Sequence, residues 1–367
     1  MVIKNLKINN FRNLKKVDLQ PANGLNIVTG ENAQGKTNLL EAIYVLSAGN
    51  SFRSGKDLQM INYGATRYQI KASYSCQSRD FIAALVFDGQ TKNLLINQKK
   101  VQFSYPDSLK VVLFNPDDLF LIKGSPNKRR SFIDFILQQL SAEYSYDLVN
   151  YSKILKKRNL ILKTEQTNKQ GFTIINQLFI ENAVKVIIKR INLVNIIDEL
   201  AAPLFLEING GRHEFRTKYA ISFPVEDDKI NQNILYKSLS EQMEKKLSEE
   251  IKRKQSLIGP QLDDINFYLD GKPAKVFASQ GQQRNMVICL KLAEVYAFKK
   301  VKGYYPVFLL DEVLAELDEN KRLLLLKHLE QAQFQSFLSA VNIDAQDDLK
   351  AAVFHIKNGQ IKGEEKI

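Results

Sequence analysis

The strongest constraint on the fold of this chain is a glycine-framed loop that joins an apolar, strand-like run to an amphipathic helix. The loop reads Gly30-Glu-Asn-Ala-Gln-Gly35-Lys36-Thr37. It follows the apolar run at 25–28 and precedes apolar positions spaced as in a helix over 39–46. Loops of this type turn backbone N–H groups toward phosphates, and their glycines adopt conformations that other residues avoid. The helix N-terminus adds a partial positive charge. The loop therefore predicts a P-loop α/β fold that binds a nucleotide.

The residues of this loop have separable roles in nucleotide binding. The Lys36 ammonium is expected to neutralise the outer phosphates, and the Thr37 hydroxyl is expected to bind Mg²⁺. The other loop residues are expected to contribute backbone groups to the same site: Gly30, Glu31, Asn32, Ala33, Gln34 and Gly35.

A second, acidic element lies near the end of the chain. The apolar segment 306–310 ends in Asp311 and Glu312. In P-loop enzymes an Asp at the end of such a strand holds Mg²⁺, and a following Glu can accept a proton from the attacking water. A strand that merely ends in solvated carboxylates is the alternative, which the loop upstream disfavours. We therefore expect Lys36, Asp311 and Glu312 to be catalytic, with Thr37 and Asp311 as metal ligands.

A third motif precedes this acidic strand. Ser279-Gln-Gly281-Gln282-Gln283 leads directly into an apolar helix, so a hydroxyl, a glycine backbone and a helix N-terminus again come together. By itself the pattern also fits an ordinary N-capped helix. Because one chain needs only one phosphate cradle, we expect Ser279, Gly281 and Gln282 to contact a nucleotide held by a second copy. This motif predicts a homodimer that forms on nucleotide binding.

Together these motifs resemble the Walker A, signature and Walker B sequences of ABC-type ATPases, and Glu316-Leu317-Asp318 resembles their D-loop. Most of the chain separates Lys36 from Asp311. Transporter ATPases have a shorter insert, and SMC-type proteins a much longer one. An insert of this size, together with the blocks at 10–14 and 123–134, is similar to the RecF family of DNA-repair proteins.

The resemblance implies an α/β fold, an ABC-type P-loop ATPase head in two sequence-separated lobes with an inserted, mainly helical arm domain. Residues 1–120 are expected to form the N-terminal part of the head, 121–254 the arm, and 255–367 the C-terminal part with signature, Walker B and D-loop. It also implies ATP and Mg²⁺ as cofactors, and it assigns Arg12 and Asp318 to the nucleotide site.

The function implied by the resemblance is ATP-controlled DNA binding. RecF-like proteins bind gapped or double-stranded DNA without sequence preference and dimerise on ATP. They work with RecR and RecO-type mediator proteins to load the recombinase in recombinational repair, replication restart and the SOS response. A weak, DNA-stimulated ATPase would act as the dimerisation switch. The alternatives are an ATPase subunit that drives a membrane transporter, disfavoured by the insert length, and a structural SMC-like head, which would need coiled-coil arms.

Two departures from the family pattern bear on function. The family usually has Gly-Pro-His-Arg-Asp-Asp where this chain has Gly259-Pro-Gln261-Leu262-Asp-Asp264, so the His and Arg that could contact phosphate or DNA are missing. After the last buried strand, Ser339 stands near the position of a switch residue. Either Ser339 senses the γ-phosphate or the sensor is absent, and slow hydrolysis is expected.

The net charge of +12 is concentrated in one segment. Residues 121–190 hold thirteen Lys and Arg against five Asp and Glu, with tyrosines interspersed. Lys and Arg bind phosphates without reading sequence, and tyrosines can stack on bases, so we expect a DNA-binding face there. Its candidate residues are Lys153, Lys156, Lys157 and Arg158. A solvated helix surface is the alternative, and a structural salt bridge is equally compatible with Arg129 and Arg130.

One long amphipathic helix is expected over 235–251, where apolar residues recur every four positions. Within it, Glu249 and Arg253 are spaced for an ion pair one turn apart, as are Glu250 and Lys254.

The cysteines and the apolar runs of the chain indicate the cellular compartment that we expect for the protein. Cys76 and Cys289 lie far apart without a partner motif, which argues against a disulfide framework and fits a reducing cytosol. The chain has no apolar run of the length of a membrane span, and its start does not resemble a secretory signal. We therefore expect a cytoplasmic protein without a membrane partner.

Overall fold

The computed structural model describes residues 1–53, 55–164, 170–225, 230–341 and 350–366. The chain divides into two compact units. Unit 1 comprises Met1–Phe120 and Val287–Ile367, and unit 2 comprises Leu121–Met286. The sequence-based division has the same first boundary but returns to the head at residue 255. The second boundary differs because residues after 255 add strands to a sheet of unit 2.

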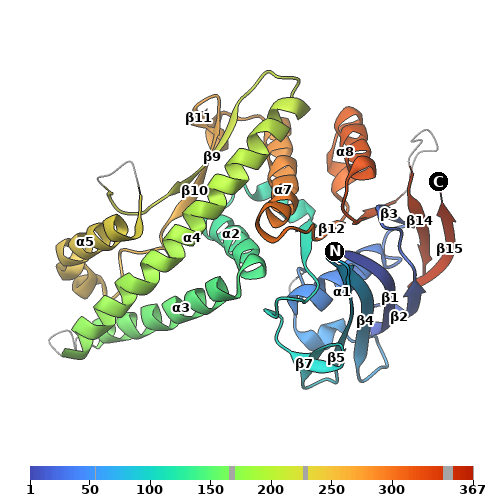
Figure 1. Cartoon of the computed structure of the whole chain (residues 1–367), viewed down its shortest axis with the longest axis horizontal. Helices are drawn as coiled ribbons and strands as arrows, with labels where there is room; N and C mark the ends of the chain where they lie inside the picture. The colour runs from blue at the N-terminus through green and yellow to red at the C-terminus, as the bar shows by residue number, and fades with distance from the viewer. Residues whose placement is uncertain (54, 165–169, 226–229, 342–349, 367) are drawn as a thin grey trace. The chain divides into compact units, whose positions relative to one another are not determined.

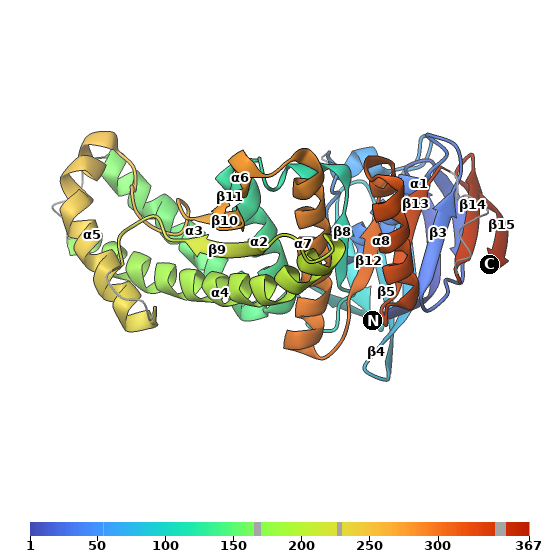
Figure 2. The same cartoon turned by 90° about the horizontal axis from the view of Figure 1, so that it is seen from above.

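In its described residues, unit 1 holds two six-stranded sheets, and helix α1 (Lys36–Ala48) contacts strands of both (Figures 1 and 2). The first sheet is antiparallel and has the order β2 (Leu14–Leu19), β1 (Val2–Phe11), β4 (Tyr68–Cys76), β5 (Arg79–Phe87), β6 (Lys92–Ile96), β7 (Lys99–Val101). Strands β4 and β5 alternate buried and less buried residues, as expected where one face meets the core.

The second sheet of unit 1 carries the predicted motifs. Its order is β15 (Gln360–Lys366), β14 (Ala352–Lys357), β3 (Leu25–Thr29), β13 (Ser336–Ala340), β12 (Val307–Leu310), β8 (Val111–Phe114). Apart from β15, neighbouring strands are parallel, and β3, β12 and β13 are buried along their whole length. Continuous apolar runs are typical of parallel strands covered on both faces. Because the strands are parallel, the loops after β3, β12 and β13 all leave the same edge of the sheet.

Helices and short turns complete unit 1. Helix α8 (Glu319–Gln331) follows β12, and 3-10 turns connect other described elements of this unit. Helix α7 (Gln280–Lys302) begins with residues of unit 2 and continues into unit 1. The 3-10 turns are η1 (Asp57–Met60), η2 (Pro116–Phe120) and η3 (Val313–Glu316).

Unit 2 is mainly helical, with one small sheet. Its elements are α2 (Pro126–Leu140), α3 (Ala142–Lys163), α4 (Gln170–Ile208), β9 (Phe215–Ala220), α5 (Gln232–Arg253), β10 (Asp264–Leu269), β11 (Lys272–Pro273) and α6 (Ala274–Phe277). Helix α3 packs along the much longer α4, as Figures 1 and 2 both show. The long helix expected over 235–251 is present as α5.

The turn that departs from the family pattern is anchored inside unit 2. Arg129 binds Asp264 through two hydrogen bonds of 2.7 and 2.8 Å, and Arg130 donates to the Asp263 carbonyl at 2.6 Å. The Asp263 carboxylate accepts from the Tyr219 hydroxyl, and burial raises the pKa of Asp263. The structural salt bridge is therefore observed for Arg129, whereas Arg130 bonds to a main-chain carbonyl.

Within the described ranges, none of the helices combines the length and the apolar character needed to cross a membrane.

Candidate nucleotide site

The phosphate loop lies between β3 and α1. Gly30 and Gly35 have φ angles of 150° and 120°, which a side chain would disfavour. Gly35 is the N-cap of α1, and no side chain caps this helix start. The buried Lys36 ammonium donates to the carbonyls of Gly30 and Glu31 at 2.8 and 3.0 Å. The loop therefore presents a helix N-terminus and a cation, the chemistry of a phosphate cradle.

Residues from the start of α1 and from the ends of β12 and β13 meet beside this loop. The Thr37 hydroxyl and the Ser339 hydroxyl both donate to Asp311 Oδ1, at 2.9 and 2.8 Å. The Glu312 N–H donates to Ser339 Oγ at 2.9 Å. Burial raises the pKa of Asp311, and the two hydroxyls lower it in part. The sequence-predicted metal ligands are thus adjacent, although Thr37 and Asp311 lie 274 positions apart in the chain.

Glu312 and Ser339 have distinct positions at this edge. Glu312 is exposed and has a left-handed backbone, with φ 55°. Ser339 is fully buried and bonds to the carboxylate of Asp311. The exposed carboxylate of Glu312 can reach solvent at the site, whereas Ser339 fixes the orientation of Asp311.

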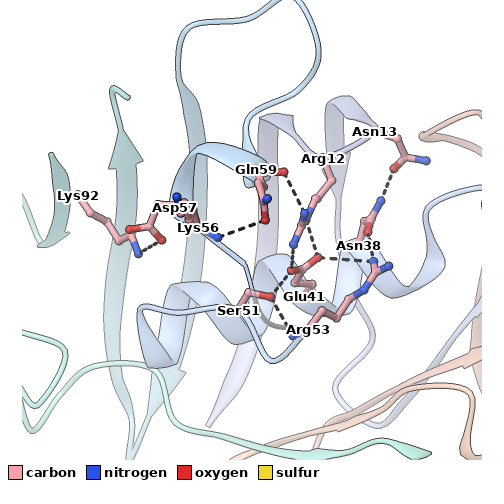
Figure 3. A network of polar contacts seen from close by, with 10 residues as sticks. All are labelled: Arg12, Asn13, Asn38, Glu41, Ser51, Arg53, Lys56, Asp57, Gln59 and Lys92. Atoms are coloured by element: carbon pink, nitrogen blue, oxygen red, sulfur yellow. Dashed lines mark hydrogen bonds and ion pairs between the residues drawn. The ribbon is translucent and has the colours of Figure 1, made fainter. Parts of the chain in front are cut away.

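The Arg12 side chain is bonded to the side of α1 (Figure 3). Its guanidinium binds the fully buried Glu41 at 2.6 and 3.1 Å and donates to the Gln59 carbonyl at 2.9 Å. A nucleotide contact by Arg12, as the resemblance implies, would have to replace or extend these bonds.

Arg53 is a candidate that the site prediction missed. Its guanidinium donates to Asn38 Oδ1 at 2.8 Å and lies 3.9 Å from Glu41, while about half of its side chain is exposed (Figure 3). Asn38 follows Thr37 directly, so a cation stands beside the start of α1. The signal in the sequence was the Ser51-Phe-Arg53 block after the first helix.

The Ser279 turn is a closed helix cap within unit 2. Ser279 Oγ accepts from the Gln282 N–H at 3.2 Å, and Gln282 Oε1 accepts from the Ser279 N–H at 2.9 Å. This reciprocal pair satisfies two donors at the start of α7. Val276 and Phe277, just before it, expose 73% and 59% of their surface.

Asp318 is the N-cap of α8. Its Oδ1 accepts from the Lys321 N–H at 3.1 Å, and its Oδ2 pairs with the Lys321 ammonium at 2.5 Å. These bonds lower the pKa of Asp318. Its carboxylate thus has a structural partner inside its own unit.

The four candidate DNA residues on α3 separate into two groups. Lys153, Lys156 and Lys157 are exposed and line an open groove of about 500 Å³ with residues of α4. Arg158 is fully buried and binds Glu250 of α5 at 2.6 and 3.1 Å. Arg158 therefore does not contribute to the expected DNA-binding face, because its guanidinium is enclosed and paired.

The Arg158 contacts also correct one of the two ion pairs expected on α5, that of Glu250 with Lys254. Glu249 pairs with Arg253 at 2.7 Å, as its spacing suggested. Glu250 instead turns into the interior toward Arg158, where Ser256 and Asn176 complete the hydrogen bonds. The helical spacing of Glu250 and Lys254 did not show this burial.

Known proteins resemble this chain along its whole length. The family model described as the RecF/RecN/SMC N terminal domain matches residues 2–361. The DNA replication and repair protein RecF of Bacillus velezensis is 37% identical over 371 residues, which covers 98% of this chain and 100% of the relative. The protein of the same name from Bacillus subtilis is 36% identical with the same coverage.

Solved structures give the same picture. The structure described as the recombination mediator protein RecF-ATPrS in the RecFOR pathway superimposes with a TM-score of 0.88 at 30% identity, covering 98% of this chain and 97% of that one. The Smc head domain from Pyrococcus furiosus has a TM-score of 0.59 at 15% identity, covering 100% of this chain and 96% of that one. The second likeness concerns the fold alone.

Proposed function

This chain belongs to the RecF family, and we propose that it is a DNA replication and repair protein whose ATPase site is the phosphate loop with Thr37, Asp311 and Glu312. The observation that supports this most directly is the meeting of Thr37 and Asp311 next to the cradle formed by Lys36. The membrane-transporter alternative has no comparable support.

Each side chain has a role that follows from its position. Lys36 exchanges the carbonyls of Gly30 and Glu31 for the outer phosphates of ATP, to which its charge is better matched. Thr37 and Asp311 offer hard oxygen donors side by side, which suits Mg²⁺. A bound Mg²⁺ would offset charge on the phosphates. Glu312, exposed one position after Asp311, is placed to accept a proton from the attacking water.

Dimerisation on ATP is part of the proposal. The Ser279 turn has the hydroxyl, glycine and helix N-terminus of an anion site. The exposed side chains of Val276 and Phe277 next to it supply apolar surface that a second copy can cover. Ser279, Gly281 and Gln282 of one copy would then contact the ATP held by the other.

DNA binding completes the proposed cycle. The exposed Lys153, Lys156 and Lys157 offer positive charge suited to a DNA backbone, gapped or double-stranded. ATP-driven dimerisation would bring two such faces onto one DNA, and a weak, DNA-stimulated hydrolysis would release them. The relatives' names support recombinational repair, with RecR and RecO-type mediators as partners, and the same role would serve replication restart and the SOS response.

The substitution Glu312→Gln tests the proposal. The variant should bind ATP, lose at least about 100-fold in hydrolysis rate, as expected for a general base, and accumulate as a dimer in ATP. Phosphate release and light scattering, with and without ATP at fixed salt, measure both effects. The exposed Glu319→Gln on α8 is the matched control. Unchanged turnover in Glu312→Gln would assign the base to another group.

A further inference from the structure

The C-terminal hairpin touches the phosphate loop through its turn. Strands β14 and β15 are joined by Asn358 and Gly359, with φ angles of 50° and 71°, as a tight two-residue hairpin turn requires. The Gly359 N–H donates to the main-chain carbonyl of Gln34 at 2.9 Å. The Asn358 N–H donates to the side-chain oxygen of Gln34 at 2.7 Å. One loop residue is thus held at two points.

The hairpin turn and the phosphate loop are packed so closely that two of their glycines have no room for a side chain. A Cβ added to Gly359 would lie 2.1 Å from the carbonyl oxygen of Asn13. A Cβ added to Gly30 would lie 2.4 Å from the carbonyl oxygen of Ile356 on β14. The phosphate loop, the turn at Asn13 and the hairpin therefore fit together backbone to backbone.

The carbonyl groups of the loop show what this contact does. A phosphate cradle needs its N–H groups turned inward, so its carbonyls must be held elsewhere. Lys36 holds the carbonyls of Gly30 and Glu31. The carbonyl of Ala33 accepts from Asn13 Nδ2 at 3.3 Å, and that of Gln34 accepts from Gly359. Of these four bonds, the last two come from outside the loop.

The bonds from Asn13 and Gly359 contribute more to holding the loop when ATP binds. In the proposed function Lys36 turns to the phosphates and so gives up the carbonyls of Gly30 and Glu31. Inside the loop, the Gln34 N–H still donates to the Glu31 carbonyl at 3.4 Å. From outside, the contacts of Asn13 and the hairpin turn hold the loop, and neither has to move.

We propose that the Asn358-Gly359 turn is a positioning element of the ATP site, which acts through Gln34 and sets ATP affinity from the far end of the chain. This inference rests on the proposed function, because it concerns the ATP held by the same loop. Asn358 and Gly359 hold the loop in the shape that receives the phosphates.

A pair of glycine substitutions in one hairpin tests the proposal. Gly359→Ala should weaken binding of a fluorescent ATP analogue about tenfold or more, since the new Cβ pushes the turn away from Asn13 and Gln34. Gly363→Ala on β15 is the matched control and should stay within about twofold. Among the described atoms, its Cβ meets His355 Cδ2 alone, at an ordinary 3.5 Å. Equal ATP affinity of the two variants would overturn the proposal.

A second variant covers the case in which Gly359→Ala fails to fold. Gln34→Ala removes the bond from the Asn358 N–H and keeps the main-chain bond, so ATP affinity should fall about fivefold, the order of one neutral hydrogen bond. Affinity is measured well below the melting temperature, and thermal unfolding without ATP is followed in parallel. A lower melting temperature with wild-type ATP affinity would mean a merely structural contact and would also overturn the proposal.

Different experimental results would contradict the proposed function and this inference. Lys36→Met should weaken binding of the ATP analogue about 100-fold, independently of the hairpin. If Lys36→Met binds ATP with wild-type affinity, the proposed site is wrong. If it shows this loss while Gly359→Ala and Gln34→Ala bind normally, only the role of the hairpin is wrong.

Discussion

The loop before α1 and the turn before α7 both bring a glycine and a hydroxyl residue to a helix start, yet their backbones differ. At α1, Gly30 and Gly35 have positive φ angles, and the N-cap Gly35 makes no side-chain cap. At α7, Ser279 and Gln282 cap each other's N–H groups. The first helix start has no side-chain cap, whereas the second is satisfied by its own side chains.

This difference indicates that similar sequence motifs can serve two successive steps of the proposed cycle, ATP binding and dimerisation. The phosphate loop has its cation, its candidate metal ligands and its bracing within unit 1, so we expect ATP to bind to a single chain. In the proposed dimer, the Ser279 turn would have to exchange its internal bonds for bonds to a phosphate. That exchange would be favourable only when a second copy delivers the phosphate, so we expect the turn to act after ATP has bound.

The largest effect is expected from breaking the first helix start. Lys36→Met removes the buried ammonium and should weaken ATP binding about 100-fold, the upper range for charge-assisted hydrogen bonds. Titration with a fluorescent ATP analogue measures this loss, with the exposed Lys71→Met as control. If the two variants bound ATP with similar affinity, the start of α1 would not be the phosphate site, and its contrast with the start of α7 would be wrong.

The second helix start should affect assembly and not binding. Ser279→Arg places a large cation where the turn meets a second copy, so ATP affinity of the monomer should stay within about twofold while the ATP-dependent dimer is lost. Light scattering with and without ATP separates these outcomes. A Ser279→Arg variant that still dimerises in ATP would show that the turn does not complete a shared site.

A smaller effect is expected at the exposed lysines of unit 2. Changing Lys153, Lys156 and Lys157 together to Ala should weaken DNA binding about tenfold and reduce the slope of log affinity against log salt by up to about 2.7, or about 0.9 for each phosphate that is no longer neutralised. ATP affinity should not change. Titration of duplex DNA at several salt concentrations measures the slope.

The neighbouring Arg158 provides the contrast for that experiment. Arg158→Ala should leave the salt slope unchanged and lower the free energy of unfolding by about 3–5 kcal/mol, because it leaves Glu250 buried without its partner. A triple-lysine variant with the wild-type salt slope would place the DNA contacts elsewhere.

The smallest effect concerns the cap of α7 itself. Gln282→Ala removes the acceptor for the Ser279 N–H and should cost about 0.5–1 kcal/mol of stability, as other helix caps do. Thermal unfolding measures it, with the exposed Gln280→Ala as control. No loss in Gln282→Ala would mean that the turn is not held closed by this pair.

The parts of the site that were predictable from sequence are those whose chemistry is local. The phosphate loop is one continuous segment, and the strand ending at Asp311 carries its own signature. The α/β head with a helical arm followed from these motifs and from the resemblance, and the family and the structural likeness confirm it. Arg53 was overlooked because the Ser51-Phe-Arg53 block does not show what the Arg53 side chain contacts, and its place beside Asn38 is seen only in the structure.

Burial set by distant partners could not be predicted in the same way. Arg158 follows Lys156 and Lys157 directly, so it looked like one more basic surface residue. Its environment comes from Glu250, 92 positions further on. A weak signal was present, since Tyr151 and Leu162 lie one or two turns away on the same face of α3 and are buried with it. The contact of Gln34 with the hairpin had no signal beyond the turn residues themselves.

The place of β3 in its sheet also determines when the protein can become active during its synthesis. Strand β3 is made among the first residues, yet its two neighbours, β13 and β14, come from the last part of the chain. At ordinary rates of translation, the interval is on the order of tens of seconds. Until then both edges of β3 lack these partners, so the nascent chain cannot hold ATP in the finished site. A polypeptide truncated before β13 therefore lacks both neighbours of β3, and we expect it to be excluded from the proposed ATP cycle.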